Sequence, residues 1–271
     1  MTAILAFAAL AYLLAAATGA QWVATSDDDP RHDHWRIASI TTGLLAVCAH
    51  AALHVLAWRD SGGPDMHFFA ALSLVTLGMA MFTATVAWKQ QLQALGIVVY
   101  PLTAIMLALY HFFGHLRAEE LDWRLLLHAY LALLAYATLS LSALLAMGLW
   151  AQERALRSRQ IHGWLRALPP LTQMEVLLFR SIEVGFVLLT LTLITGLLFV
   201  HDLLGQHLWH KTVLSVLSWL VFGWLLVGRW RHGWRGVRAV KLTLAAMALL
   251  LLAFFGSKFV LEVILHRSET M

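Results

Sequence analysis

The sequence predicts an all-α, polytopic membrane protein with about eight transmembrane helices in one bundle. Apolar residues make up 61% of the 271 residues and charged residues only 13%, whereas soluble domains have roughly 45–50% and 25%. A soluble fold of this composition would expose large apolar surfaces, which promotes aggregation. The apolar residues also form long continuous runs without two-residue alternation, which favours spanning helices over the strands of a barrel.

Eight apolar runs are each long enough to cross about 30 Å of hydrocarbon. We expect spans at about 2–23, 37–58, 67–88, 93–113, 124–149, 176–200, 209–229 and 237–264. The first run ends in small residues, as a signal peptide does, but no Lys or Arg precedes it, which favours a span. The segments between the runs are too short for a core of their own, so residues 1–271 are expected to form a single membrane domain.

Lys and Arg residues are divided unequally between the two sets of loops. The loops after the first, third, fifth and seventh spans contain eleven of them, and the other loops and the C-terminal tail contain five. Basic loops tend to stay in the cytoplasm, so both termini are expected in the periplasm. The loop 150–175 is expected to lie on the cytoplasmic leaflet, with an interfacial helix over 151–167 that ends before Pro169 and Pro170.

Fourteen histidines are the unusual feature of the composition. Four fall in the predicted cytoplasmic loops: His32, His34, His162 and His232. Ten lie at or near the predicted outer ends of spans: His50, His54, His67, His111, His115, His128, His201, His207, His210 and His266. A hydrogen bond between helices could explain any one of the ten. Together they favour a haem or metal site in an outer cavity, because imidazole is a common ligand of both.

The pairs His50–His54 and His111–His115 each share a helix face because their members are four residues apart. Such pairs can bind zinc or copper. No intramembrane Asp or Glu joins either pair, which disfavours a transporter of divalent cations because such a transporter is expected to use carboxylates.

Four cations near the predicted outer face could pair with the carboxylates of a bound ligand, such as the propionates of haem: Arg117, Arg124, Lys211 and Lys258. Lys258 could instead form an internal ion pair with Glu262. Trp209 could stack on a flat macrocycle, or it could belong to the aromatic belt of the membrane interface.

The sequence also excludes several classes of protein. The single cysteine, Cys48, excludes an internal disulfide and every CxxC-type zinc, redox or covalent-haem motif. Any haem is therefore expected to be non-covalent, of the b type. The basic residues are not gathered on one soluble face, so no nucleic-acid partner is expected. A nucleophile–base pair or an acid dyad is not evident either, which favours a protein that is not an enzyme.

Several segments of the second half resemble the cytochrome c assembly membrane-protein family, of the CcsA, CcmC and HemX type, and most of all its HemX and YpjD-like branch. They are LLLHAYLALLAYATLSLSALLAM at 125–147, RALPPLTQMEVLLFRSIEVGFVLLTLTLITGLLF at 166–199, HLWHKTVLSVLSWLVFGWLLVGRWRHGWRG at 207–236 and FFGSKFVLEVILH at 254–266. Their order and spacing are similar to the family over roughly 124–266.

The resemblance implies haem handling at the outer face of the inner membrane. It places the two outer histidines of the family on His128 and His266, as haem iron ligands. The family's tryptophan-rich segment corresponds to HDLLGQHLWHK, which keeps Trp209 and Lys211 but lacks the repeated tryptophans and the final Trp-Asp. A histidine that the family carries near the inner end of the next span is replaced here by Val227, which argues against a second, inner haem.

The favoured interpretation is a haem-binding inner-membrane protein of the cytochrome c assembly type. The iron ligands are expected to be His128 and His266, and the same outer cavity is expected to contain His210, His54, His207, Trp209, Lys211 and Lys258. Partners could include lipid, haem and other cytochrome c maturation or haem-synthesis proteins. One alternative is a b-type cytochrome-like electron carrier, which needs histidine pairs at both membrane depths. The other is a cofactor-free regulator or scaffold of haem synthesis.

Overall fold

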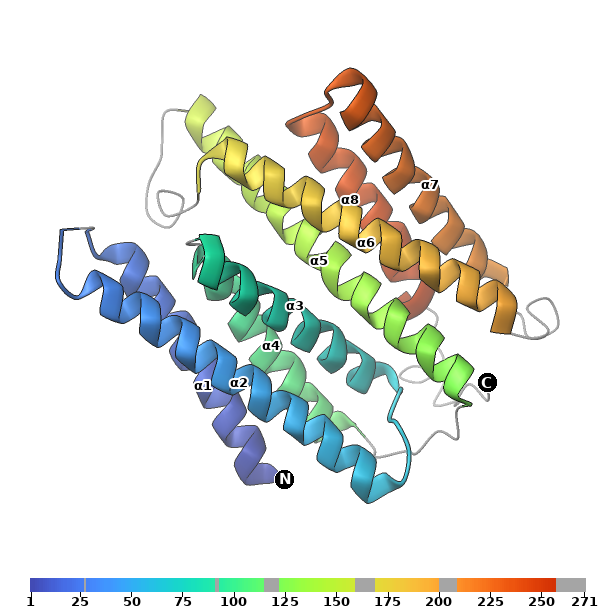
Figure 1. Ribbon diagram of the computed structural model, residues 1–271, viewed down its shortest axis with the longest axis horizontal. Coiled ribbons are helices and arrows are strands. Elements are labelled where there is room, and N and C mark those ends of the chain that lie inside the picture. The colour runs from blue at the N-terminus through green and yellow to red at the C-terminus, as the bar shows by residue number, and fades with distance from the viewer. Residues whose placement is uncertain (27, 91–92, 115–121, 159–168, 200–208, 257–271) are drawn as a thin grey trace. The chain divides into compact units, whose positions relative to one another are not determined.

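The computed structural model describes residues 1–26, 28–90, 93–114, 122–158, 169–199 and 209–256. These residues form eight α-helices and one short π-helical turn, and they contain no strand. The helices are α1 (Thr2–Ala24), α2 (His32–Ser61), α3 (Phe68–Gln90), α4 (Gln93–Phe113), α5 (Trp123–Arg157), α6 (Leu171–Phe199), α7 (Trp209–His232) and α8 (Val237–Leu251), and the π-helical turn η2 (Leu252–Gly256) follows α8 (Figure 1).

All eight helices are long and apolar enough to cross a membrane, so the predicted number of spans and the all-α fold class are confirmed. Several helices exceed the predicted spans because polar ends extend the apolar segments. The largest difference is in α5, which continues to Arg157. The first residues of the predicted interfacial helix therefore belong to α5, and residues 159–168 of that loop lie outside the described residues.

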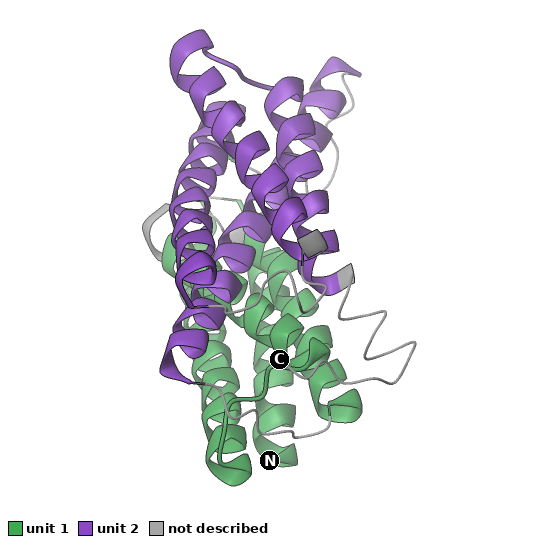
Figure 2. Ribbon diagram, turned by 90° about the vertical axis from the view of Figure 1, so that its right-hand side faces the viewer, with its two compact units in different colours: residues 1–120, 162–169 green, residues 121–161, 170–271 purple. Residues whose placement is uncertain are grey.

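The chain divides into two compact units, shown in Figure 2. Unit 1 comprises residues 1–120 and 162–169 and contains α1–α4, and unit 2 comprises residues 121–161 and 170–271 and contains α5–α8. Each unit is described by itself below. The single membrane domain expected from the sequence stays a prediction.

In unit 1, α1 packs against α2 and α4, and α3 packs against α4 and α2. In this unit, two glycines leave room for the side chain of Tyr100. A Cβ atom at Gly43 on α2 would lie 2.7 Å from the Tyr100 hydroxyl, and one at Gly96 would lie 2.6 Å from the Tyr100 ring. Small residues therefore create the space that the buried Tyr100 fills. The helix α2 ends at Gly62, which adopts a left-handed conformation with φ of 78° that favours glycine.

In unit 2, α5 packs against α6 and α8, and α7 packs against α6 and α8. A Cβ atom at Gly185 on α6 would lie 2.5 Å from the Leu139 side chain on α5. Helix pairs in this unit are also joined by side-chain hydrogen bonds. Tyr136 of α5 donates to the Leu250 carbonyl of α8 at 2.7 Å. These contacts fix the helices that carry the candidate site.

Candidate functional site

The imidazole of His128 lies near the start of α5, where α5 packs against the last turns of α6. Its Nδ1 atom is 3.1 Å from the hydroxyl of Thr195 on α6. A Cβ atom at Gly196 would lie 3.0 Å from Cε1 of the same ring. The glycine at 196 therefore leaves the space in which the ring lies against the backbone of α6.

The hydrogen bonds of Thr195 favour one tautomer of His128. The Thr195 hydroxyl donates to backbone carbonyls of its own helix. Its oxygen lies 2.9 Å from the Leu191 carbonyl and 3.0 Å from the Thr192 carbonyl. A hydroxyl has a single proton, so toward His128 its oxygen accepts. This arrangement favours the tautomer with the proton on Nδ1 of His128, in which Nε2 keeps the lone pair that a metal ligand needs.

A cation lies one turn from this imidazole on the same helix. Arg124 precedes His128 by four residues, and residues at this spacing share a helix face. Its guanidinium lies 5.6 Å from the ring centre of Trp123 and 5.9 Å from that of Phe199. An imidazole with a free lone pair, a cation and aromatic rings thus meet at one end of the α5–α6 pair. This combination suits a flat ligand that carries a metal and carboxylates.

The other residues expected in this cavity are described only in part. Lys211 is half-buried in the first turns of α7. The backbones of Trp209 and His210 belong to α7, but their side chains are not described. His207, Lys258 and His266 lie outside the described residues. His54 belongs to unit 1 and His128 to unit 2, so their placement in one cavity stays a prediction.

In unit 1, a chain of buried polar side chains passes from α1 through α2 to α3. The Tyr12 hydroxyl is 3.2 Å from Nδ1 of His50. Nε2 of His50 is 2.9 Å from the Ser73 hydroxyl, and Nε2 of His54 is 3.0 Å from the same oxygen. The two imidazoles are stacked, with ring centres 5.3 Å apart. Tyr12, His50 and Ser73 are completely buried.

A second polar group lies at the end of unit 1 where α2 is followed by α3. Asp65 accepts a hydrogen bond from Nδ1 of His67, and the Tyr110 ring contacts both His67 and His54, with ring centres 5.8 and 4.8 Å away. The Tyr110 hydroxyl lies beside the Asp65 carboxylate, and Asp65 Oδ2, His67 Nε2 and this hydroxyl are all buried in the described part of the chain without a hydrogen bond of good geometry. Buried polar atoms without partners are costly, so these three indicate a place for a small polar ligand.

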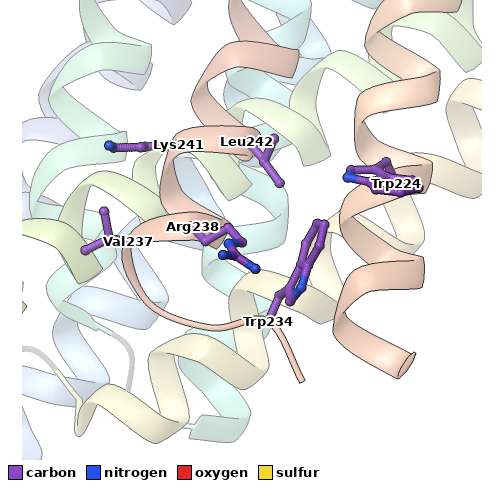
Figure 3. Close-up of a pocket in the computed structure, with 6 residues that line it drawn as sticks. All are labelled: Trp224, Trp234, Val237, Arg238, Lys241 and Leu242. Atoms are coloured by element: carbon purple, nitrogen blue, oxygen red, sulfur yellow. The ribbon is translucent and has the colours of Figure 1, made fainter. Parts of the chain in front are cut away.

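At the opposite end of unit 2 from His128, the turn between α7 and α8 forms an open groove of about 560 Å³. Its lining residues are Trp224, Trp234, Val237, Arg238, Lys241 and Leu242 (Figure 3). The Arg238 guanidinium lies 5.0 Å from the Trp234 ring centre. Glu175, at the start of α6, holds this turn by accepting from Arg235 and from the Gly236 amide. Indoles and cations at a helix end are typical of the membrane interface.

The sequence prediction identified His50, His54, His67 and His128 but not their partners. Thr195, Ser73, Tyr12, Tyr110 and Asp65 were missed, because hydroxyls and one loop carboxylate have no distinctive spacing in an apolar sequence. The pattern Asp65-Met66-His67 was an available indication of a carboxylate–imidazole pair. Among the described side chains, no group of three or more His, Cys, Asp or Glu residues is arranged to hold a metal ion.

The fold and these sites define a multi-pass helical membrane protein with ordered imidazoles inside its helical units. The family model for cytochrome C assembly protein matches residues 38–265, so the chain belongs to this family, as the resemblance of its second half predicted. The match begins within α2 and continues past the end of α8, so it covers α2–α8 and includes most of the first half of the chain, where the sequence provided less evidence.

Individual relatives agree with this assignment. Inner membrane protein YpjD of Escherichia coli (strain K12) is 34% identical over 234 residues, which cover 85% of this chain and 89% of the relative. Cytochrome c biogenesis protein CcsA of Synechococcus sp. (strain CC9902) is 23% identical, covering 93% of this chain and 91% of the relative. Protein HemX of Brevibacillus brevis is 31% identical, covering 49% of each chain. No solved structure matches the chain.

Proposed function

We propose that this chain is a haem-binding inner-membrane protein of the cytochrome c assembly type. The observation that carries the proposal is the contact between Nδ1 of His128 and the Thr195 hydroxyl, which leaves Nε2 on the other side of the ring for iron. A ligating histidine usually donates its other N–H to a neighbouring acceptor, which orients the ring and raises its basicity. The surroundings of His128 therefore fit a haem ligand.

In this proposal His128 and His266 would hold the haem iron, because imidazole nitrogen is a common ligand of haem iron. Arg124, Lys211 and Lys258 neutralise the propionates, because a cation next to a carboxylate in a site of low dielectric is strongly favoured. Trp209 stacks on the macrocycle, and His207 and His210 belong to the same cavity. The haem is held without covalent bonds because the chain offers no CxxC motif.

The names of the relatives support the proposed location and partners. YpjD is named an inner membrane protein and CcsA a cytochrome c biogenesis protein. We place this chain in the bacterial inner membrane, with both termini in the periplasm and the His128 end of unit 2 at the outer face. The partners are haem, lipid and other proteins of cytochrome c maturation or haem synthesis.

The hydrogen bonds of unit 1 weigh against a b-type electron carrier with a haem between His50 and His54. Both Nε2 atoms are bonded to Ser73, and ligation would break these bonds. A cofactor-free regulator of haem synthesis remains the second candidate, and the presence of pigment distinguishes it from a haem-binding protein.

The test is the haem content and absorbance spectrum of the detergent-purified protein from haem-replete cells. We expect bound haem with sharp α and β bands after reduction, and loss of most of it in His128→Ala. His232→Ala is the matched control, because His232 is exposed at the other end of unit 2 and its loss should leave haem content unchanged. A colourless native protein would contradict the proposal and favour the cofactor-free regulator.

A further inference from the structure

Unit 1 contains a hydrogen-bonded chain that haem binding in unit 2 does not use. We propose that Tyr12, His50, Ser73 and His54 form a proton-transfer path inside unit 1, which begins at Asp65, His67 and Tyr110. The proposal requires no haem and is independent of the function proposed above.

The Ser73 hydroxyl is placed to pass a proton between the two imidazoles. Its oxygen is within hydrogen-bond distance of Nε2 of His50 and Nε2 of His54. A hydroxyl with one proton can donate to only one of them, and it accepts from the other. Reversing both bonds transfers one proton. The N–H bond of protonated His54 breaks as Ser73 gains that proton, and the original O–H bond of Ser73 breaks as Nε2 of His50 gains the other.

The second nitrogen of His50 continues the path. Its Nδ1 atom faces the Tyr12 hydroxyl, so His50 can accept a proton at Nε2 while Nδ1 remains bonded to Tyr12. Tyr12 in turn stacks on Tyr100 of α4, with ring centres 5.8 Å apart. Polar residues are costly within a membrane and commonly form proton relays there, and this set has its hydrogen bonds in the order that a relay requires.

The group at Asp65 supplies the end of the path closest to solvent. The His67 side chain is 15% exposed and Asp65 is 4% exposed, whereas His50 is fully buried. Asp65 accepts a hydrogen bond from Nδ1 of His67, because a carboxylate is acceptor-only. The Tyr110 ring stacks on His54 and so lies between the two polar groups.

The buried polar atoms of this group could bind a water molecule that connects His67 with His54. Asp65 Oδ2 and neutral His67 Nε2 can each accept a hydrogen bond, and the Tyr110 hydroxyl can donate or accept one. A water molecule offers two donors and two acceptors and suits this combination. Buried water commonly satisfies such polar groups, and a water held here would carry protons from His67 toward His54.

Deuterium exchange of the imidazole N–H groups tests the path. The native protein, labelled with ¹⁵N-histidine in lipid bilayers, is transferred to D₂O, and the His50 and His54 rings are followed by solid-state NMR. We expect both buried rings to exchange. In Ser73→Ala the exchange of His50 should become slower by about tenfold or more while that of His67 is unchanged, because exchange at a buried site without a relay requires opening of the structure.

The direction in which the exchange rate of His50 changes distinguishes a proton relay from a structural role of Ser73. A variant that merely loosens unit 1 exchanges His50 faster, together with its backbone amides. Thr76→Val is the matched control, because the Thr76 hydroxyl donates to the Ser73 carbonyl at 3.0 Å and is not part of the path. It should leave His50 unchanged. Unchanged or faster exchange in Ser73→Ala would overturn the proposal, as would a His50 that does not exchange in the native protein.

Asp65→Asn keeps the proposal testable if Ser73→Ala does not fold. Asparagine is nearly isosteric with aspartate, but its neutral amide cannot form the charge-assisted hydrogen bond that the Asp65 carboxylate accepts from Nδ1 of His67. Exchange of both His54 and His50 should then slow, with Ser73 intact. Equal exchange in Asp65→Asn and the native protein would contradict the assignment of Asp65 to the path.

Discussion

The two units differ in how their buried imidazoles are bonded. In unit 1, both ring nitrogens of His50 and Nε2 of His54 contact a hydroxyl. In unit 2, His128 contacts Thr195 through Nδ1, and the Thr195 proton is directed to its own helix. An imidazole whose Nε2 is bonded to a relaying hydroxyl suits transfer of protons, and one that contacts its partner through Nδ1 suits ligation through Nε2. The bonding partners, rather than the histidines themselves, distinguish the two roles.

The largest expected effect is on the packing that supports His128. Gly185→Val should reduce the free energy of unfolding of unit 2 by about 3 kcal/mol, the upper end for overpacking, because the new side chain meets the buried Leu139 on α5. Denaturation by SDS, followed separately with probes in each unit, measures this. Equal destabilisation of both units would contradict the description of two units.

The second-largest effect is expected on haem affinity, when the hydroxyl of Thr195 is removed. Thr195→Val removes the hydroxyl that contacts Nδ1 of His128, so we expect haem affinity to fall by about 10–100-fold, as for other outer-shell partners of metal ligands. Thr195→Ser retains the hydroxyl and should bind haem like the native protein. Haem titration monitored by absorbance gives both affinities, and equal affinities for the valine and serine variants would show that the tautomer is not controlled by Thr195.

The corresponding change in unit 1 should affect stability rather than haem. Ser73→Ala removes the hydrogen-bond partner of two buried imidazoles, which costs about 1–3 kcal/mol for an unsatisfied buried group. Haem content should remain native. A loss of haem in this variant, at a temperature where it is folded, would mean that the two units do not have separate roles.

The smallest effect is expected at the surface. The hydrogen bond from Arg31 holds the pKa of Asp29 below its usual value, so any contribution of this pair to stability exists at neutral pH and is lost as the pH falls through that lowered pKa. Because the pair is solvent-exposed, Asp29→Asn should not change the melting temperature measurably at neutral pH. A clear change in the melting temperature would mean that the turn before α2 contributes more to stability than its exposure indicates.

The fold could be predicted from the sequence because the apolar runs alone indicate eight helices, and each run appears as a helix. The helix ends were less predictable. The helix α5 continues through Arg154 to Arg157, because its basic residues lie beyond the apolar segment and still favour helix.

The candidate site was predictable only in part. His128 was identified because an imidazole in an apolar segment is uncommon and a family resemblance pointed to it. Thr195 and Ser73 could not be found in this way, because many hydroxyl residues in spanning helices bond to their own backbone, as Thr83 does, and the sequence does not show which of them also contact another helix. Their role depends on which helices pack together, and hydropathy does not encode this.

The most direct test of the central claim is chemical rescue of His128. In His128→Gly the imidazole is removed and a cavity remains in which free imidazole can bind the iron. We expect the purified variant, titrated with haem in lipid nanodiscs, to lack the sharp reduced bands and to regain them when imidazole is added. The same treatment of His54→Gly should show native bands without imidazole. Native bands in His128→Gly before imidazole is added would contradict the account, because His128 would then not ligate the haem.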